Sequence, residues 1–223
     1  MKSFLRNKYE LWVWTYDNEI KLPDGAFLKN ANELIDETEL FLNKAGSYAG
    51  FSDYFRYKVL NTYGGLYADT DVIALKEADD LPEKEFLVTE RIKSNDKRFK
   101  INGNVIYSPN PSKGNIIDLA YVYSRSFRKE EIYWSEIGPA LLTAITQIYP
   151  RHSFEIHPPD FANPVSWWDC PKKLLFKGEK LSRETFFVHC YNEMWRRSGI
   201  DKNKIKCHEN SIINLAFKLT IYI

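Results

Sequence analysis

The stretch over residues 51–72, FSDYFRYKVLNTYGGLYADTDV, constrains the fold of this chain most strongly. Its first part carries Phe51, Phe55 and Val59 at every fourth position, which predicts a helix over residues 47–61. A Gly-Gly pair ends this helix, and a short apolar strand follows that finishes in Asp-Thr-Asp. A helix that leads directly into a buried strand is typical of α/β proteins, in which the carboxyl ends of strands carry ligand sites.

The rest of the sequence alternates between the same two kinds of element. Strands are expected over residues 9–16, 85–89, 104–107 and 185–190, and helices over residues 2–7, 30–43, 112–125 and 138–149. Residues 157–171 hold four prolines and two tryptophans without periodicity, which predicts a loop. Strands separated by helices indicate an α/β fold with a mostly parallel, twisted sheet flanked by helices.

Length and charge limit the classes of protein to which the chain can belong. With 223 residues, of which 44% are hydrophobic, it can build one sizeable core, so a single domain over residues 1–223 is expected. A formal net charge of +1 provides no overall field toward nucleic acid or an anionic membrane. We therefore expect no nucleic-acid partner.

The cysteines and the hydropathy of the sequence indicate the cellular compartment in which the protein is expected. Cys170, Cys190 and Cys207 form no CxxC pair, and any disulfide scheme leaves one of them over, which fits a reducing environment. No apolar run reaches the roughly 20 residues needed to span a bilayer, and the first residues lack the layout of a signal peptide. These features predict a cytoplasmic protein without a transmembrane segment.

Two aspartates at the end of the predicted short strand are the first candidates for chemistry. On an extended strand, Asp69 and Asp71 point to the same side because side chains alternate. Neighbouring carboxylates repel each other unless a cation shares them, and Mg²⁺ or Mn²⁺ prefers such oxygen ligands. The alternative is a solvated turn whose two acids face water, and the tripeptide by itself does not decide between the two.

The preceding helix adds a second pair of charged residues. Asp53 and Arg56 lie at positions i and i+3 and so share one face of that helix. They are candidates to bind sugar hydroxyls and phosphate through charge-assisted hydrogen bonds. Alternatively, they form a surface ion pair of little energetic value.

The run SDYFRYKVLNTYGGLYADTD resembles the signature of the DXD-containing sugar transferases of glycosyltransferase family 32, and more distantly the glucosylating domain of large clostridial toxins. Weaker similarity extends over residues 29–33, 138–143 and 188–195. The resemblance implies a GT-A fold and a metal-dependent transfer of sugar from a nucleoside-diphosphate-sugar to a carbohydrate acceptor. Manganese or magnesium is the cofactor that it implies, and polysaccharide biosynthesis is the process.

The same resemblance assigns roles to particular residues. It implies that the donor is contacted by Ser52, Asp53, Arg56, Tyr67, Asp69 and Asp71. It implies a catalytic role for Asp53, Arg56 and Asp69. Asp69 would contact ribose, sugar or metal, and Asp71 would bind the metal directly. A further ligand near the C-terminus is usual in GT-A enzymes, and His189 is the best candidate for it, with Asn192 and Trp195 as weaker ones.

One departure from the family pattern concerns the beginning of the chain. Family members normally start with a strand and a Trp-containing loop that contribute nucleobase contacts, whereas this sequence begins at Met1 with the helix that follows them. We therefore expect the first nucleotide-binding strand to be absent. Trp12, Trp14 and Tyr16 are candidates to stack a base in its place, although an aromatic stripe on a strand more commonly belongs to the core.

Two further groups of residues allow a functional and a structural interpretation. Asn102 and Asn104 would either bind sugar hydroxyls or shape a hairpin or bulge. Asp160, Trp167 and Trp168 in the proline-rich loop would either bind an acceptor sugar through aromatic faces or anchor the loop.

The sequence thus favours a metal-dependent glycosyltransferase, for which family membership suggests retention of anomeric configuration. A non-catalytic nucleotide-sugar or carbohydrate-binding module derived from such an enzyme is the alternative. A metal-dependent phosphohydrolase ranks last, because the additional His and Asp cluster of a two-metal site is missing from the sequence pattern. No well-placed nucleophile or base can be identified from the residues alone.

Overall fold

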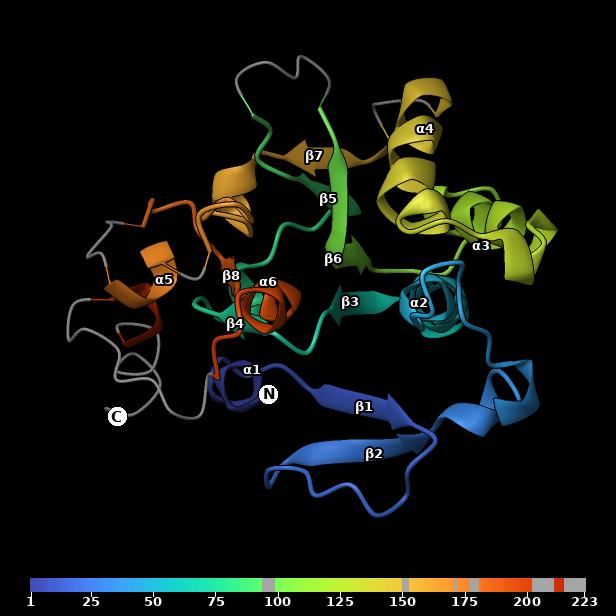
Figure 1. Cartoon of the computed structure of the whole chain (residues 1–223), viewed down its shortest axis with the longest axis horizontal. Helices are drawn as coiled ribbons and strands as arrows, with labels where there is room; N and C mark the ends of the chain where they lie inside the picture. The colour runs from blue at the N-terminus through green and yellow to red at the C-terminus, as the bar shows by residue number, and fades with distance from the viewer. Residues whose placement is uncertain (94–98, 150–152, 171, 177–180, 202–210, 215–223) are drawn as a thin grey trace.

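The computed structural model describes residues 1–93, 99–149, 153–170, 172–176, 181–201 and 211–214 (Figure 1). Its helices are α1 Lys2–Arg6, α2 Ala49–Tyr63, α3 Ile116–Ser126, α4 Leu141–Ile148, α5 Lys172–Phe176 and α6 Asn192–Arg197. Its strands are β1 Leu11–Thr15, β2 Ala26–Asn30, β3 Gly65–Ala68, β4 Val72–Ala74, β5 Phe86–Thr89, β6 Ile101–Ser108, β7 Glu155–His157 and β8 Phe187–His189. Helices and strands are both present throughout the chain, which confirms a mixed α/β structure.

The sheets mix parallel and antiparallel pairs. The central sheet has the order β3-β6-β5-β7, in which β6 runs antiparallel to both of its neighbours and β5 runs parallel to β7. Two smaller sheets pair β1 with β2 in parallel and β4 with β8 antiparallel. The prediction of a mostly parallel sheet is therefore wrong. Residues 90–100, which join β5 to β6, are too few for a crossover helix, and a short connection favours an antiparallel pair.

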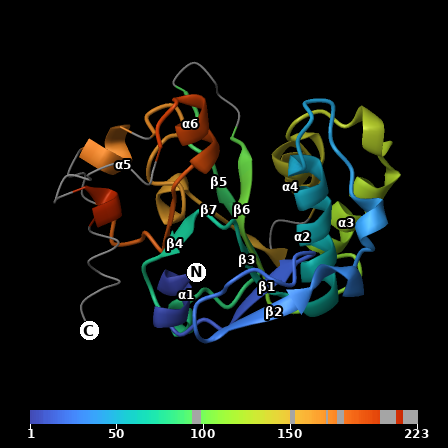
Figure 2. The ribbon, with the colours of Figure 1, turned by 60° about the horizontal axis from the view of Figure 1, so that its bottom comes forward.

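The middle strands of the central sheet bury both faces. Leu87 and Ile106 point into a core shared with α2, α3 and α4, whereas Phe86, Val88 and Val105 point into a second core that includes β4 and β8. Figures 1 and 2 show the two groups of elements on opposite sides of the sheet. This alternation follows the period of two of a strand, and each fully buried side chain of this size contributes roughly 1.5–3 kcal/mol.

Helix α2 leads into the central sheet through a sharp reversal at its end. The expected helix over residues 47–61 is observed over Ala49–Tyr63, and Gly64 follows it with φ of 70°. A Cβ atom at Gly64 would lie 2.8 Å from the carbonyl oxygen of Pro109, so both the backbone angle and the space require glycine. Strand β3, Gly65–Ala68, begins at the next residue, one position before the strand expected over residues 66–69.

The helix expected over residues 30–43 does not form. Two short 3₁₀ turns, Ala31–Glu33 and Glu37–Glu39, occupy the segment instead. The side chains of Asn30 and Asp36 accept hydrogen bonds from the backbone N–H groups of Asn32 and Thr38, at 3.0 and 2.9 Å. Such local bonds offer the backbone an alternative to a continuous helix. Strand β2, just before this segment, is mostly exposed and lacks the apolar alternation that would have predicted it.

The proline-rich segment is a mostly irregular connection, as expected. It begins in β7 and continues through a 3₁₀ turn, Pro159–Phe161, whose Phe161 ring stacks on His157 at 4.1 Å. The Cys170 thiol donates a hydrogen bond to the carbonyl oxygen of Cys190 at 3.3 Å. Pro171 and Cys207 lie outside the described residues.

Within the part of the chain that the structure describes, no helix is long and apolar enough to cross a membrane.

Candidate metal and donor site

The two predicted aspartates lie on a tight turn between β3 and β4. The N–H of Val72 donates to the carbonyl oxygen of Asp69 at 3.0 Å, which closes the turn. The expectation that Asp69 and Asp71 extend a strand is therefore wrong, because the chain turns at residues 69–71 before β4 begins. Neighbouring strands hold the turn on both sides, since the Asp69 N–H donates to Asn104 and the Cys190 N–H donates to the carbonyl oxygen of Asp71.

The pairing of β4 with β8 brings His189 to this turn. Val72 lies opposite His189 in that ladder, and the imidazole Nε2 is 3.3 Å from Oδ1 of Asp71. One ligand atom from each of Asp69, Asp71 and His189 can be chosen so that all lie within 4.8 Å of one another. An ion bound at roughly 2.0–2.6 Å from its ligands bridges atoms that lie about 4–5 Å apart. The three predicted metal ligands therefore meet at one place.

The chemistry of these groups suits a dication. His189 is 8% exposed, and its Nδ1 has no hydrogen-bond partner among the described residues, so an imidazole nitrogen is available as a ligand. Burial works to raise the pKa of Asp71, but the hydrogen bond and charge of His189 and the backbone N–H of Asn192, 2.8 Å from Oδ2, lower that pKa overall. Asp71 is thus held as a carboxylate, the form that binds metal.

Next to the turn, Arg56 lies between two carboxylates. Its Nη2 is 3.2 Å from Oδ1 of Asp53 and 3.4 Å from Oδ1 of Asp69. Its Nη1 donates to the carbonyl oxygen of Gly103, and the guanidinium lies 4.5 Å from the centre of the Tyr67 ring. The side chains of Asp53 and Arg56 are each only 8% exposed, so the surface ion-pair interpretation is wrong.

The remaining donor-contact candidates belong to the same network. The Tyr67 hydroxyl donates to Oδ1 of Asp69 at 2.7 Å, and the Ser52 hydroxyl accepts from Arg56 at 3.4 Å. Burial raises the pKa of Asp53 to about 6, against the lowering effect of Arg56, and the charge of Asp69 raises it further. One guanidinium faces two carboxylates, which makes the electrostatics of Asp53 and Asp69 interdependent.

Two glycines from different elements make room for this buried pair. A Cβ atom at Gly103 in β6 would lie 2.7 Å from Nη1 of Arg56. A Cβ atom at Gly138, just before α4, would overlap the carboxylate of Asp53. The segments around residues 103 and 138 thus approach α2 closely only because they lack side chains there.

Asn104 has a supporting position in the structure. It is 1% exposed, and its Nδ2 donates to Oδ1 of Asn163 at 3.0 Å, while Asn163 donates to the carbonyl oxygen of Thr89. Its backbone N–H donates to Oδ1 of Asn102, and its carbonyl oxygen accepts from Asp69. Asn104 therefore ties the aspartate turn to the central sheet, in line with the structural interpretation.

The aromatic residues of β1 divide between surface and core. The Trp12 ring is partly exposed and carries the ammonium of Lys29 at 4.2 Å from its centre. Trp14 stacks on Tyr63 of α2 at 5.4 Å, and the Tyr16 hydroxyl donates to the carbonyl oxygen of Ile35. Trp14 and Tyr16 therefore have structural roles, because they pack against α2 and the segment around it. The Trp12 side chain remains partly exposed to solvent.

Two residues that the sequence did not single out lie beside the metal candidates. Tyr191 has φ of 49°, unusual for a residue with a side chain, and its ring centre lies 3.9 Å from that of His189. Its hydroxyl is 3.3 Å from Oε1 of Glu90, whose pKa is raised by burial. Glu90 directly follows a predicted strand, and the end of a strand is a position at which a functional carboxylate can be sought. For Tyr191, the available signal was its place in the segment 188–195, which resembles the family.

The weaker candidates after β8 have structural contacts. The Trp195 indole N–H donates to the carbonyl oxygen of Cys190 at 2.6 Å, and its ring is buried in the core next to α6. Asn192 reaches the site through its backbone N–H and not through a described side-chain contact. In the proline-rich loop before β8, Asp160 forms an ion pair with Arg91. Trp167 and Trp168 lie edge to face with their ring centres 5.5 Å apart.

Comparison with known proteins gives one family match. Residues 2–87 match the family model described as a glycosyltransferase sugar-binding region containing a DXD motif. The match includes α2, β3 and the aspartate turn, and ends within β5. No curated protein and no solved structure matches the chain.

Proposed function

We propose that this chain, whose residues 2–87 are a DXD-containing glycosyltransferase sugar-binding region, moves a sugar from a nucleoside-diphosphate-sugar to a carbohydrate acceptor with the help of a divalent cation. The observation that carries the proposal is the convergence of Asp69 and Asp71 with His189, about 120 residues later in the sequence, on one point next to the buried Arg56. We assign the whole chain to one domain of GT-A type, for which the mixed α/β architecture and the family match are the support. The resemblance to family 32 supports retention of configuration.

Asp69, Asp71 and His189 would hold the cation, Mn²⁺ or Mg²⁺. When bound, such an ion supplies positive charge to the diphosphate that leaves with its bonding electrons. The two carboxylates and one imidazole match the oxygen and nitrogen ligands that these ions accept. Among the described residues, no second cluster of three such groups accompanies this one, which disfavours a two-metal phosphohydrolase.

The network behind the turn would position the donor. Arg56 already neutralises Asp53 and Asp69 partly, and Tyr67 fixes the same Asp69 oxygen, so the carboxylate enters the reaction with little freedom to reorient. We assign the sugar hydroxyls to Asp53 and Ser52, and the charge at the sugar-phosphate link to Arg56. Burial of this pair strengthens each polar contact relative to water.

Release of nucleoside diphosphate from a panel of nucleotide sugars, with and without Mn²⁺, tests the proposal. The wild-type protein is expected to hydrolyse at least one donor slowly in the presence of Mn²⁺ and not in the presence of EDTA. Asp71→Asn is expected to lose this activity by at least about 100-fold, because it removes a ligand charge while keeping the volume of the side chain. Asp24→Asn, at an exposed position away from the turn, serves as the matched control.

The outcome also separates an enzyme from a binding module. A protein that only binds the donor would raise its melting temperature with the nucleotide sugar and Mn²⁺ but release no diphosphate. Full activity of Asp71→Asn at ordinary Mn²⁺ concentrations would contradict the assignment of the metal site.

A further inference from the structure

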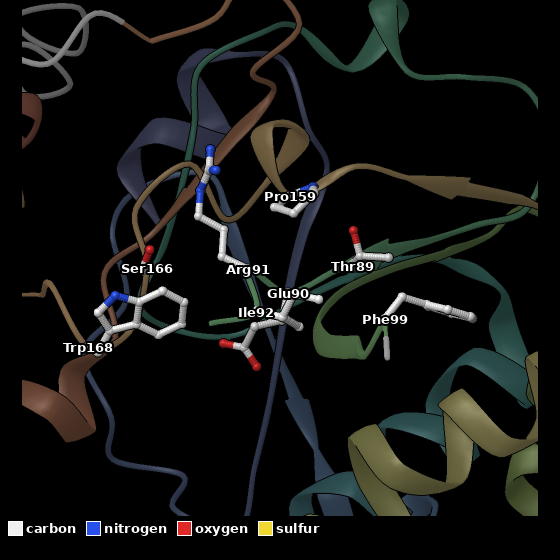
Figure 3. A pocket seen from close by; sticks show the side chains of 8 residues that line it. All are labelled: Thr89, Glu90, Arg91, Ile92, Phe99, Pro159, Ser166 and Trp168. Carbon is white, nitrogen blue, oxygen red and sulfur yellow. The ribbon is translucent and has the colours of Figure 1, made fainter. Parts of the chain in front are cut away.

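A cavity of about 440 Å³ opens beside Glu90 (Figure 3). Its wall includes Glu90, Arg91 and Ile92 after β5, Phe99 before β6, and Pro159 and Trp168 from the proline-rich segment. The volume lies within the range of small-molecule sites, roughly 300–1,000 Å³. The cavity therefore has the size of a site for a sugar unit of an acceptor.

The lining combines apolar faces with one carboxylate that can accept a hydrogen bond. Figure 3 shows the Glu90 carboxylate on the side of the cavity that faces the Trp168 ring, whereas the Arg91 guanidinium extends the other way. Arg91 is already occupied, because it pairs with Asp160 and its Nε donates to the carbonyl oxygen of Pro164 at 3.0 Å. A flat aromatic face opposite a hydrogen-bond acceptor suits a sugar ring, which has apolar C–H groups on one side and hydroxyls at its edge.

Tyr191 connects this cavity to the metal candidates. Its ring packs against His189, and its hydroxyl donates to Oε1 of Glu90 at 3.3 Å. The left-handed backbone conformation at Tyr191 aims the ring into this position, and a residue with such a conformation is held there by its surroundings. The Glu90 carboxylate is therefore one side chain away from a predicted metal ligand.

From this arrangement, and resting on the function proposed above, we propose that the cavity is the acceptor subsite, in which Trp168 stacks a neutral sugar ring and Glu90 accepts a hydrogen bond from one of its hydroxyls. Tyr191 is a positioning residue that orients the Glu90 carboxylate. A sugar carboxylate placed beside Glu90 is disfavoured, because the two anions would repel each other and the charge of Arg91 is paired with Asp160; the ammonium of Lys93 lies on the Trp168 side, 5.9 Å from the centre of that ring.

The test measures acceptor binding and donor turnover separately. The probes are methyl glycosides of neutral hexoses and of glucuronic acid, with binding followed by saturation-transfer NMR and by tryptophan fluorescence. Donor turnover is followed in the same preparations as Mn²⁺-dependent release of nucleoside diphosphate without acceptor. At least one neutral glycoside is expected to bind, and the glucuronide is expected to bind about tenfold more weakly or not at all.

Variants then assign the binding to this cavity. Trp168→Ala and Glu90→Gln are expected to weaken glycoside binding by about tenfold or more. Tyr191→Phe is expected to raise the acceptor KM by about threefold to tenfold and leave the kcat of transfer nearly unchanged, a split that a general loss of structure would not produce. Trp134→Ala and Glu83→Gln, at exposed positions outside the cavity, are the matched controls.

The two proposals fail in different ways. Binding of no neutral glycoside by the wild type, or equal binding by Trp168→Ala and Glu90→Gln, overturns the acceptor subsite even where donor turnover is normal. Loss of glycoside binding in these variants together with an absence of donor turnover in the wild type supports the sugar site and contradicts the transferase function.

Discussion

At the scale of single residues, the unusual feature is a guanidinium buried between two carboxylates. Arg56 holds Asp53 and Asp69 at 3.2 and 3.4 Å, and the Asp53 side chain has little access to solvent. Removing one partner of such a pair leaves an uncompensated charge, which commonly costs about 3–5 kcal/mol. The arrangement is therefore sensitive to the protonation of its members.

The pKa of Asp53 gives a pH-dependent prediction. Burial raises this pKa from 3.8 to about 6, so the folded protein binds the proton more tightly than the unfolded chain does. The contribution of Asp53 to the free energy of unfolding is then greatest below the unfolded pKa and falls as the pH rises through the folded one. Compared with Asp53→Asn, the wild type is expected to lose about 2 kcal/mol between pH 4 and pH 7.

Urea denaturation of both proteins over that pH range, in EDTA, checks this expectation. The difference between their free energies of unfolding is the quantity of interest, because titrating groups remote from Asp53 cancel in it. A difference that stays constant with pH would show that Asp53 titrates near its ordinary value.

At the scale of elements, close approach explains how the pair comes to be buried. The segment before α4 and strand β6 pass α2 at Gly138 and Gly103, where any side chain would meet Asp53 or Arg56. The Tyr57 hydroxyl adds a hydrogen bond from α2 to the carbonyl oxygen of Ile137 at 3.0 Å. The site therefore depends on the docking of three elements and not on α2 alone.

Gly138→Ala tests this docking. The added methyl group overlaps the Asp53 carboxylate, and we expect a loss of about 1–3 kcal/mol in the free energy of unfolding, as for other overpacked positions. Because Asp53 causes the overlap, Gly138→Ala in an Asp53→Ala background is expected to cost clearly less. Chemical denaturation of the four proteins of this double-mutant cycle measures the difference, and strictly additive effects would mean that the glycine matters for another reason.

At the scale of the whole molecule, the antiparallel pair of β4 and β8 joins two distant parts of the chain. It places His189 opposite Val72, next to the aspartate turn, and the backbone N–H groups of Cys190 and Asn192 both donate to Asp71. A cation held by Asp69, Asp71 and His189 would bind the folded chain and not the unfolded one. Metal binding should therefore stabilise the whole fold.

Binding of Mn²⁺ is expected to raise the melting temperature of the protein. At a Mn²⁺ concentration of 100 times Kd, the gain is about 2.7 kcal/mol, which for a chain of this length raises Tm by roughly 5–10 °C. His189→Ala is expected to shift the Mn²⁺ concentration needed for the same rise upward by at least about tenfold. Differential scanning fluorimetry with Mn²⁺ titrations measures both values, with Asp24→Asn as the control and EDTA to reverse the shift; an identical titration for His189→Ala would remove it from the ligand set.

Local sequence pattern was sufficient to predict some of the secondary structure and some of the candidate site of this protein. The helical period over residues 47–61 and the Gly-Gly break predicted α2, β3 and the shared helix face of Asp53 and Arg56 correctly, because neighbours in sequence determine each of these features. Asp69 and Asp71, expected on an extended strand, lie on a turn. Asx-type hydrogen bonds at Asn30 and Asp36 replaced the predicted helix over residues 30–43. There the side chains competed locally with the helix, a competition that apolar spacing does not register.

Residue pattern alone identified the candidate groups for the chemistry: two aspartates separated by one residue, a charged pair on one helix face, and a histidine at the end of a strand. Their meeting at one site follows from the fold. Strand direction, the tight turn at Asp69 and the neighbourhood of His189, Tyr191 and Glu90 depend on contacts between segments about a hundred residues apart. Such contacts form because burial of apolar strand faces selects one pairing among many, and this selection leaves no periodic signal within any one segment.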